Sequence, residues 1–258
     1  SFVQDDAHIF CTEEQVESEI LSVLKMIDRF YSAFGYQYLV ELSTRPEKRI
    51  GDERVWDKAE SALKSALEQA GLKYHLNPGD GAFYGPKIDF HLKDSLGRTH
   101  QCGTVQLDFS MPERFDLQYV GADNKSHSPV MIHRAIAGSL ERFLGILIEH
   151  YAGKFPFWLV PQQAIVMNIT DGAKLYAENI FDLLNKNGYR VSLDDSRDKL
   201  SAKVKRAQNM KIPYMIILGE KEASENSLSL RSLNGQQEHG LSHEQLLDRF
   251  ANEVNPLS

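Results

Sequence analysis

The hydrophobic pattern of the chain changes at one short segment, and this change constrains the fold more than any other feature. Residues 153–161 read GKFPFWLVP. Before this segment, amphipathic helices flank closely connected strands, which pair antiparallel. After it, strands and helices alternate, as in a small α/β unit. The sequence therefore predicts an α+β domain with an antiparallel sheet over residues 1–155 and an α/β mixed-sheet domain over residues 156–258.

Periodicity and turn residues place the elements within each domain. In the first domain, we expect helices over residues 16–34, 56–70 and 139–151, and strands over residues 2–11, 36–42, 88–92, 98–109 and 130–137. In the second, we expect strands over residues 164–169, 189–193 and 214–218, helices over residues 172–187 and 199–210, a hairpin turn at Asn234-Gly235 and a final helix capped by Ser242.

The charge distribution bears on nucleic-acid binding. The net charge is −7, but residues 154–258 hold 13 basic and 13 acidic residues, so the acidic excess lies in the first domain. Residues 197–211 contain six basic residues and one acid. RNA needs only a local positive face, because phosphates are neutralised locally. The alternative is a solvated helix face without a partner.

Several other classes of protein find no support. No apolar run approaches the roughly 18–20 residues of a membrane-spanning helix, and the chain opens without a basic, apolar leader. Because residue 1 is not methionine and falls inside an expected strand, we expect it to be a truncation point. Cys11 and Cys102 are too few for a disulfide framework and indicate reduced thiols in the cytoplasm.

Residues 2–11 read FVQDDAHIFC and carry the first group of candidate site residues. On a strand, Gln4, Asp6 and His8 share one face, because side chains repeat every second residue. An amide, a carboxylate and an imidazole on one face are poor core material and suit a binding site. The alternative is an exposed polar face.

Two further candidates lie on the segment VMIHRAIAGSLERF, residues 130–143. His133 has the small neighbours Ala135 and Ala137 on its strand face, which leaves room for a compact ligand, although a lone histidine is usually structural. Arg142 is expected to be buried in the first turn of an apolar helix. An anionic ligand there would pair with it and with the helix N-terminus, whereas an internal salt bridge is the alternative.

A glycine-rich loop and the long strand that follows complete the candidates. Residues 81–87 read GAFYGPK, and residues 101–109 read QCGTVQLDF. Gln101 and Gln106 have opposite strand parity, so both face one pocket only if the strand is bulged. Gly103 is the natural place for that bulge.

These segments resemble the threonyl-tRNA synthetases, a family of class II aminoacyl-tRNA synthetases. The strings that carry the resemblance are DDAHIFCTEEQ, LSTRPEKRIG, GAFYGPKIDF, QCGTVQLDFSMPERF, VMIHRAIAGSLERFLGILIEHYAGKFP and KIPYMIILGEKE. They occur in the family's order and extend over essentially the whole chain. The resemblance implies a partial class II catalytic domain followed by an anticodon-binding domain.

The resemblance also implies roles for individual residues. Phe2 and Asp6 match the end of the second class II motif, F-x-x-x-D. The implied zinc ligands are His8 and His133. The implied threonine pocket is Gln4, Asp6, Tyr84 and Gln106. The residues implied to face ATP or the adenylate are Lys87, Gln101 and Arg142. The residues implied to face the anticodon bases are Arg197, Lys205, Glu222 and Arg231.

The implied activity is attachment of threonine to its tRNA through a threonyl-adenylate, with ATP, Mg²⁺ and Zn²⁺, in a homodimeric cytoplasmic parent protein. The third zinc ligand of the family is a cysteine, expected upstream of residue 1. Cys11 lies on the opposite strand face from His8 and is not assigned to the metal. The first class II motif and half of the second are missing from the chain. We therefore expect this polypeptide alone to be inactive.

Two other readings remain open from the sequence. The first is another class II synthetase, such as a prolyl or seryl enzyme, against which the pair His8 and His133 beside Asp6 speaks. The second is a non-enzymatic RNA-binding relative, against which the presence of Lys87 and Arg142 speaks. Metal content and binding of threonine tRNA distinguish these readings.

Overall fold

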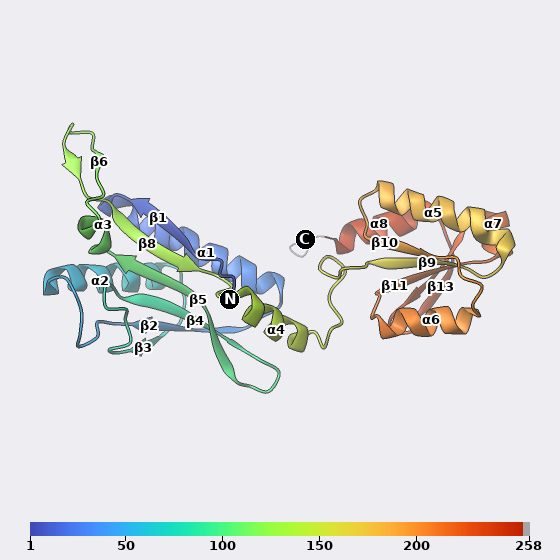
Figure 1. Cartoon of the computed structure of the whole chain (residues 1–258), viewed down its shortest axis with the longest axis horizontal. Helices are drawn as coiled ribbons and strands as arrows, with labels where there is room; N and C mark the ends of the chain where they lie inside the picture. Colours follow the sequence, from blue (N-terminus) through green and yellow to red (C-terminus); the bar gives the residue numbers. More distant parts are fainter. Residues whose placement is uncertain (255–258) are drawn as a thin grey trace. The chain divides into compact units, whose positions relative to one another are not determined.

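The computed structural model describes residues 1–254 and divides the chain into two compact units (Figure 1). The first unit is Ser1–His150, and the second begins at Tyr151.

The first unit is built on a six-stranded sheet with the strand order β1-β8-β5-β4-β2-β3. Neighbouring strands are antiparallel except β2 and β3, which are parallel. The strands are β1 (Ala7–Cys11), β2 (Tyr38–Ser43), β3 (His75–Asn77), β4 (Lys87–Lys93), β5 (Thr99–Asp108) and β8 (Val130–Ala135). This arrangement puts β1 at an edge and brings β8 and β5 next to it, although β1 lies far from both in the sequence.

Two amphipathic helices pack on this sheet and on each other, namely α1 (Val16–Ala33) and α2 (Glu53–Gln69). Their apolar faces are fully buried at Ile20, Ile27 and Leu63. Gly35 and Gly71 end them with positive φ angles, as the sequence predicts. The remaining elements are η1 (Glu13–Gln15), α3 (Met111–Arg114), the small hairpin β6 (Tyr119–Val120) and β7 (Ser126–His127), and α4 (Leu140–His150).

The second unit has a five-stranded mixed sheet with the order β10-β9-β11-β12-β13. Its strands are β9 (Ala164–Asn168), β10 (Val191–Asp194), β11 (Tyr214–Leu218), β12 (Leu228–Ser232) and β13 (Gln237–Leu241). Its helices are η2 (Asp171–Ala173), α5 (Lys174–Lys186), α6 (Leu200–Asn209), α7 (Glu220–Glu225) and α8 (His243–Glu253). Helices α5 and α8 cover one face of the sheet and α6 covers the other, so each face has its own apolar core (Figure 1).

The predicted fold class, an α+β unit followed by a mixed-sheet α/β unit, is confirmed. The predicted hairpin turn at Asn234-Gly235 joins β12 to β13, and Ser242 caps α8 by accepting a hydrogen bond from Gln245 N. The expected strand over residues 2–11 is wrong in its first half. The ladder begins at Ala7, and Gln4 makes only an isolated bridge to Ser139.

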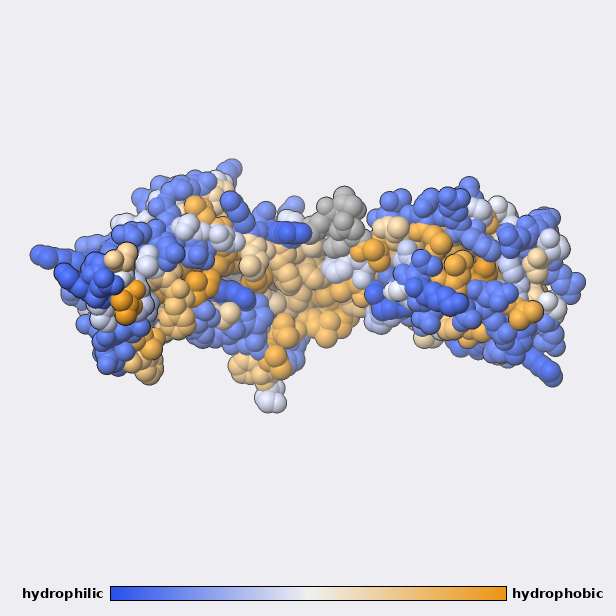
Figure 2. Space-filling view, turned by 90° about the horizontal axis from the view of Figure 1, so that it is seen from above, coloured by the Kyte–Doolittle hydropathy of each residue, from blue (hydrophilic) through white to orange (hydrophobic). Residues whose placement is uncertain are grey.

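Apolar side chains are exposed on parts of the molecular surface. Apolar surface interrupts the hydrophilic residues on both units (Figure 2), and Phe2 and Phe10 are among the exposed large apolar side chains of the first. Within residues 1–254, no helix combines the length and the apolar character needed to cross a membrane.

Candidate active site and anticodon surface

A cavity of about 370 Å³ in the first unit collects most of the predicted site residues. Its wall is formed by the N-terminal segment, the loop before β4, the strands β5 and β8, and the start of α4. The predicted residues that line it are Gln4, Asp6, Tyr84, Gln101, Gln106, His133 and Arg142. The volume lies in the range of small-molecule sites, about 300–1,000 Å³. His8 and Lys87 do not line the cavity themselves.

A bulge in β5 brings the two glutamines to the same cavity. Phe90 on β4 pairs with Gly103, but the next residue, His91, pairs with Gln101. Cys102 is therefore the extra residue, and the parity of β5 changes between Gln101 and Gln106. The sequence prediction of a bulge at Gly103 is confirmed, and both side chains line the cavity.

The N-terminal segment is held by Asp5, which sequence reasoning did not single out. Its carboxylate accepts hydrogen bonds from three consecutive backbone amides, at Ile136 (2.9 Å), Ala137 (3.1 Å) and Gly138 (2.9 Å). Gly138 has a φ of +67°, and a Cβ there would lie 2.5 Å from the carbonyl oxygen of Cys102. Asp5 thus fixes the loop between β8 and α4 to the segment that carries Gln4 and Asp6, and this explains why the ladder starts only at Ala7.

We expect Asp5→Ala to lower the free energy of unfolding of the first unit by about 2–3 kcal/mol, because charge-assisted hydrogen bonds are lost and amide donors lose their acceptor. Asp6→Ala is the matched control, since the Asp6 carboxylate has no hydrogen bond to any residue of 1–254, and it should change stability little. Urea unfolding of the chain measures both. Equal losses in the two variants would contradict the role of Asp5.

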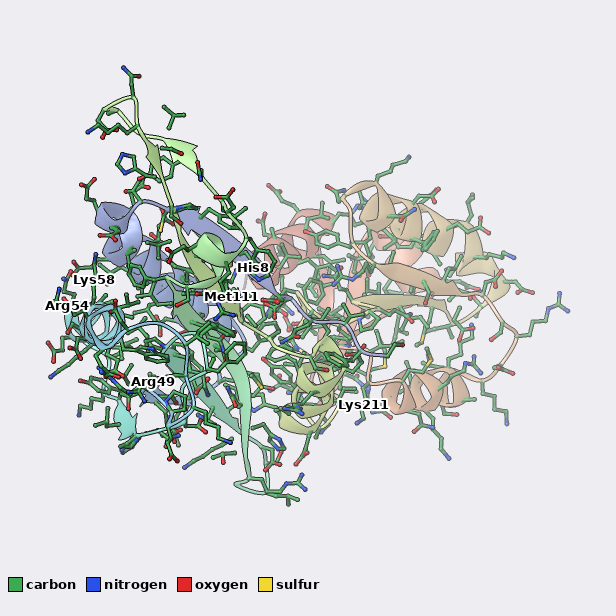
Figure 3. The ribbon with its side chains drawn as sticks, turned by 60° about the vertical axis from the view of Figure 1, so that its left-hand side comes forward. His8, Arg49, Arg54, Lys58, Met111 and Lys211 are labelled. Atoms are coloured by element: carbon green, nitrogen blue, oxygen red, sulfur yellow. The ribbon has the colours of Figure 1, made fainter. Side chains whose placement is uncertain are left out.

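His8 and His133 lie directly opposite each other in the antiparallel register of β1 and β8. Their ring centroids are 4.7 Å apart with an edge-to-face angle of 76°. Figure 3 shows His8 and Met111, at the start of α3, in this region of the first unit. No group of three or more metal-binding side chains occurs among the described residues. Two adjacent imidazoles are side chains of the kind that zinc takes as ligands in proteins.

Cys11 is not a third ligand to such a metal. It lies on the buried face of β1, whereas His8 is exposed on the other. Burial, reinforced by the charge of Glu19, raises the pKa of the Cys11 thiol to about 11. The thiolate that binds metals is therefore disfavoured at neutral pH. Cys11 and Cys102 are both free thiols.

Arg142 differs from its sequence-based expectation. We expected a buried guanidinium, but Arg142 is exposed, and its side chain makes no ion pair or hydrogen bond within residues 1–254. The helix buries Phe143, Ile146 and Leu147 instead, so Arg142 lies on the face turned towards the cavity. The alternative of an internal salt bridge is wrong. A cation without an internal partner is available to an anionic ligand.

Lys87 and Gln101 are joined by a buried carboxylate, that of Asp89, which is 1% exposed. Asp89 accepts hydrogen bonds from Lys87 and Gln101, and from the hydroxyl of Thr104 at 3.0 Å. Burial acts to lower the pKa of Lys87, but the hydrogen bonds and charges of Asp89 and Asp80 outweigh it, and the net pKa is raised. Lys87 therefore stays charged, and Asp89 orients Gln101 at the cavity wall.

Tyr84 and Gln106 form a second pair in the cavity wall. The Tyr84 hydroxyl donates a hydrogen bond to the side-chain oxygen of Gln106. Burial, together with the charges of Asp108 and Asp6, raises the pKa of Tyr84 above its usual value. At neutral pH the Tyr84 hydroxyl therefore keeps its proton and donates it in this hydrogen bond. The oxygen of the Gln106 amide is the atom that accepts.

In the second unit, Glu222 and Arg231 line a common cavity of about 190 Å³. Glu222 accepts hydrogen bonds from the Ser229 hydroxyl (2.7 Å) and from Gly219 N (2.9 Å). The Nε atom of Arg231 is buried without a hydrogen-bond partner among the described residues. His239, which sequence reasoning missed, lines the same cavity and contacts Ser229 at 2.8 Å.

The basic run 197–211 divides into two groups. Lys203 (1% exposed), Arg206 and Lys211 make internal contacts. Lys203 donates to the carbonyls of Asn168 and Asp194, Arg206 pairs with Asp194 and Asp198, and Lys211 donates to the carbonyl of Ala152. The second group is exposed, without ion pairs to described residues, and consists of Arg197, Lys199 and Lys205. The predicted residues Arg197 and Lys205 thus lie outside the Glu222 cavity but on the exposed part of the run.

The two folds and the cavity define a class II aminoacyl-tRNA synthetase core joined to an anticodon-binding domain. Residues 1–151 match the tRNA synthetase class II core domain (G, H, P, S and T), and residues 163–253 match the anticodon binding domain. The chain therefore belongs to the class II tRNA synthetase core family.

Within this class, the chain is similar to threonine–tRNA ligases. Over 90% of its own length, this chain is 61% identical to the threonine–tRNA ligase of Clostridium tetani. Over 98% of its own length, it is 54% identical to that of Thermotoga neapolitana. It spans 36–40% of the length of these relatives. The crystal structure of the RNA-binding domain of threonyl-tRNA synthetase from Cryptosporidium parvum matches 98% of this chain, and this chain covers 64% of that one, with a TM-score of 0.91 and 45% identity. The resemblance seen in the sequence is thereby confirmed.

Proposed function

We propose that the full-length protein containing this chain attaches threonine to its tRNA through a threonyl-adenylate, in the cytoplasm. One observation carries the proposal. The Asp6 carboxylate and the Arg142 guanidinium line the same cavity, and neither has an internal partner among residues 1–254. A free carboxylate and a free cation in one cavity suit a ligand with a hydroxyl donor at one end and a phosphate at the other, as when threonine meets ATP.

The chain's own residues supply most of the contacts that this reaction needs. Gln4, Tyr84 and Gln106 surround the amino acid, and Asp6 accepts the hydrogen bond of the threonine hydroxyl. Gln101 and Arg142 face the phosphates. Lys87 is linked to Gln101 because both side chains donate hydrogen bonds to Asp89. The reaction is an in-line attack of the threonine carboxylate on the α-phosphate of ATP, which breaks the bond to the β-phosphate and releases pyrophosphate, so orientation and charge stabilisation account for most of the catalysis. Mg²⁺ accompanies ATP.

His8 and His133 would hold zinc, with a third donor from the upstream part of the full-length protein. When bound, zinc supplies a Lewis acid that the amino and hydroxyl groups of threonine can chelate together. Valine lacks the hydroxyl and leaves Asp6 unpaired, which rejects it. The full-length protein is proposed to be a homodimer.

The second unit is proposed to bind the anticodon. Single-stranded bases are read by hydrogen bonds on their edges, and phosphates by basic groups. Glu222 and Arg231 offer an acceptor and a donor in one cavity, and Arg197 and Lys205 offer exposed positive charge.

Threonine-dependent exchange of pyrophosphate into ATP tests the proposed activity. The full-length protein should catalyse it with threonine and not with valine or proline, and the 258-residue chain alone should not. Exchange that follows another amino acid would overturn the threonine assignment. Binding of threonine tRNA without any exchange by the full-length protein would favour a non-enzymatic RNA-binding protein.

We expect Arg231→Ala to weaken binding of threonine tRNA by about 10–100-fold, since one base-edge contact contributes roughly 1–3 kcal/mol. Arg249→Ala is the matched control, because Arg249 pairs with Glu238 at 2.6 Å and does not line the Glu222 cavity. Filter binding at fixed salt measures both. Similar losses in the two variants would indicate a general charge effect instead of base recognition.

A further inference from the structure

The side chain of Asp108 is completely buried at the end of β5, beside the histidine pair. Its Oδ1 atom accepts hydrogen bonds from Ser110 N (2.8 Å) and Met111 N (2.9 Å). Its Oδ2 atom lies 3.0 Å from Nε2 of His133. A buried carboxylate needs such partners. Here Oδ1 binds the backbone amides, and Oδ2 contacts the histidine ring.

The contact fixes the tautomer of His133. A carboxylate with one oxygen bonded to backbone amides can only accept at the other, so Nε2 of His133 carries the proton. The remaining nitrogen, Nδ1, then has a free lone pair, and it has no hydrogen bond to a residue of 1–254. Metals bind the unprotonated nitrogen of a neutral imidazole.

We infer that Asp108 is a positioning residue, which holds the His133 ring in the orientation and tautomer that present Nδ1 to zinc. The inference rests on the proposed zinc site formed by His8 and His133. It extends that site to a residue that touches neither the metal nor the amino acid.

The chain contains a matched pair elsewhere that separates this role from simple turn stabilisation. Asp94 accepts hydrogen bonds from Leu96 N (3.0 Å) and Arg98 N (2.8 Å) through Oδ1. Its Oδ2 atom lies 3.0 Å from Nε2 of His100. The backbone and histidine contacts resemble those of Asp108, although Asp94 Oδ2 also accepts a hydrogen bond from Arg98 Nε at 2.6 Å. His100 does not line the cavity.

Asp108→Asn gives the sharpest test. The two backbone amides retain the asparagine oxygen at the position of Oδ1, so the amide NH₂ replaces Oδ2 and donates to Nε2 of His133. The ring proton must then move to Nδ1, the nitrogen that zinc needs. We expect zinc affinity in the full-length protein to fall by roughly 10–100-fold, and to fall less in Asp108→Ala, which removes the contact without imposing the wrong tautomer.

Two measurements check this order. Competition with a chromophoric chelator gives the zinc affinity of the full-length protein, and ¹⁵N NMR of the 258-residue chain reports the His133 tautomer. Asp94→Asn should leave zinc affinity unchanged. A merely structural Asp108 predicts the reverse order, because asparagine keeps the backbone hydrogen bonds that alanine loses.

The outcomes separate the two levels of the proposal. If the wild-type full-length protein binds no zinc, the proposed zinc site fails and this inference fails with it. If the wild type binds zinc and Asp108→Asn binds it equally well, or if His133 carries its proton on Nδ1 in the wild-type chain, only the inference is overturned.

Discussion

Replacing His133 with alanine in the full-length protein is expected to abolish zinc binding and to lower kcat/KM for threonine activation by about 10³-fold, or roughly 4 kcal/mol. The reason is geometric. His133 stands between His8, whose ring centroid is 4.7 Å away, and Tyr84, whose ring centroid is 5.2 Å away. Its loss removes a proposed metal ligand and one wall of the proposed amino-acid pocket together.

The effect should fall on threonine and not on ATP, because Arg142 and Gln101 are untouched. Pyrophosphate exchange at varied threonine and ATP, with zinc content measured on the same samples, tests this. His127→Ala is the matched control, since His127 is exposed in the β6–β7 hairpin, where its ring lies beside Asp123 and Tyr119. A variant that lost zinc but kept full threonine activation would disprove the metal's role.

The parts of the fold that follow from local rules were predictable from the sequence. The helical spacing from Val16 ends at Gly35 because a left-handed glycine stops a helix. The opposite parities of Gln101 and Gln106 predicted a bulge, which the pairing of β4 with β5 contains. In both cases the deciding information lies within a few neighbouring residues.

The parts that failed depend on contacts between distant residues. Gln4 and Asp6 were expected on a strand, but Asp5 binds amides more than 130 positions away and takes that segment out of the ladder. Arg142 was expected to be buried, because the apolar sequence of its helix does not reveal which face is buried. The buried Phe143 packs against Phe30 of α1 and against Phe34, which directly follows that helix.

The same limit hid the acidic residues that support the site. Asp89 and Asp108 are buried carboxylates, and each has at least one partner on another strand. A sequence shows the charge of an aspartate but not the donors around it. The available signal is strand parity. Asp89 is two residues from Lys87, and Asp108 is two residues from Gln106, so each pair shares one face of its strand.

The second large effect is expected at Arg142. Changing Arg142 to alanine in the full-length protein should lower kcat/KM for pyrophosphate exchange by about 10²–10³-fold, the usual loss when a preorganised donor to developing charge is removed. Arg142→Lys should recover only part of this, because an ammonium cannot make the paired hydrogen bonds of a guanidinium.

The stability of the variants distinguishes a catalytic role from a structural one. Arg142 makes no side-chain contact with a charged or hydrogen-bonding partner in residues 1–254, so its removal should leave the thermal unfolding midpoint of the first unit unchanged. Arg134 is the comparison on the same cavity wall, since it donates to the Asp5 carbonyl at 2.8 Å and its loss should lower that midpoint. If Arg142→Ala destabilised the fold as Arg134→Ala does, the guanidinium would have an internal partner and would not be free to meet a phosphate.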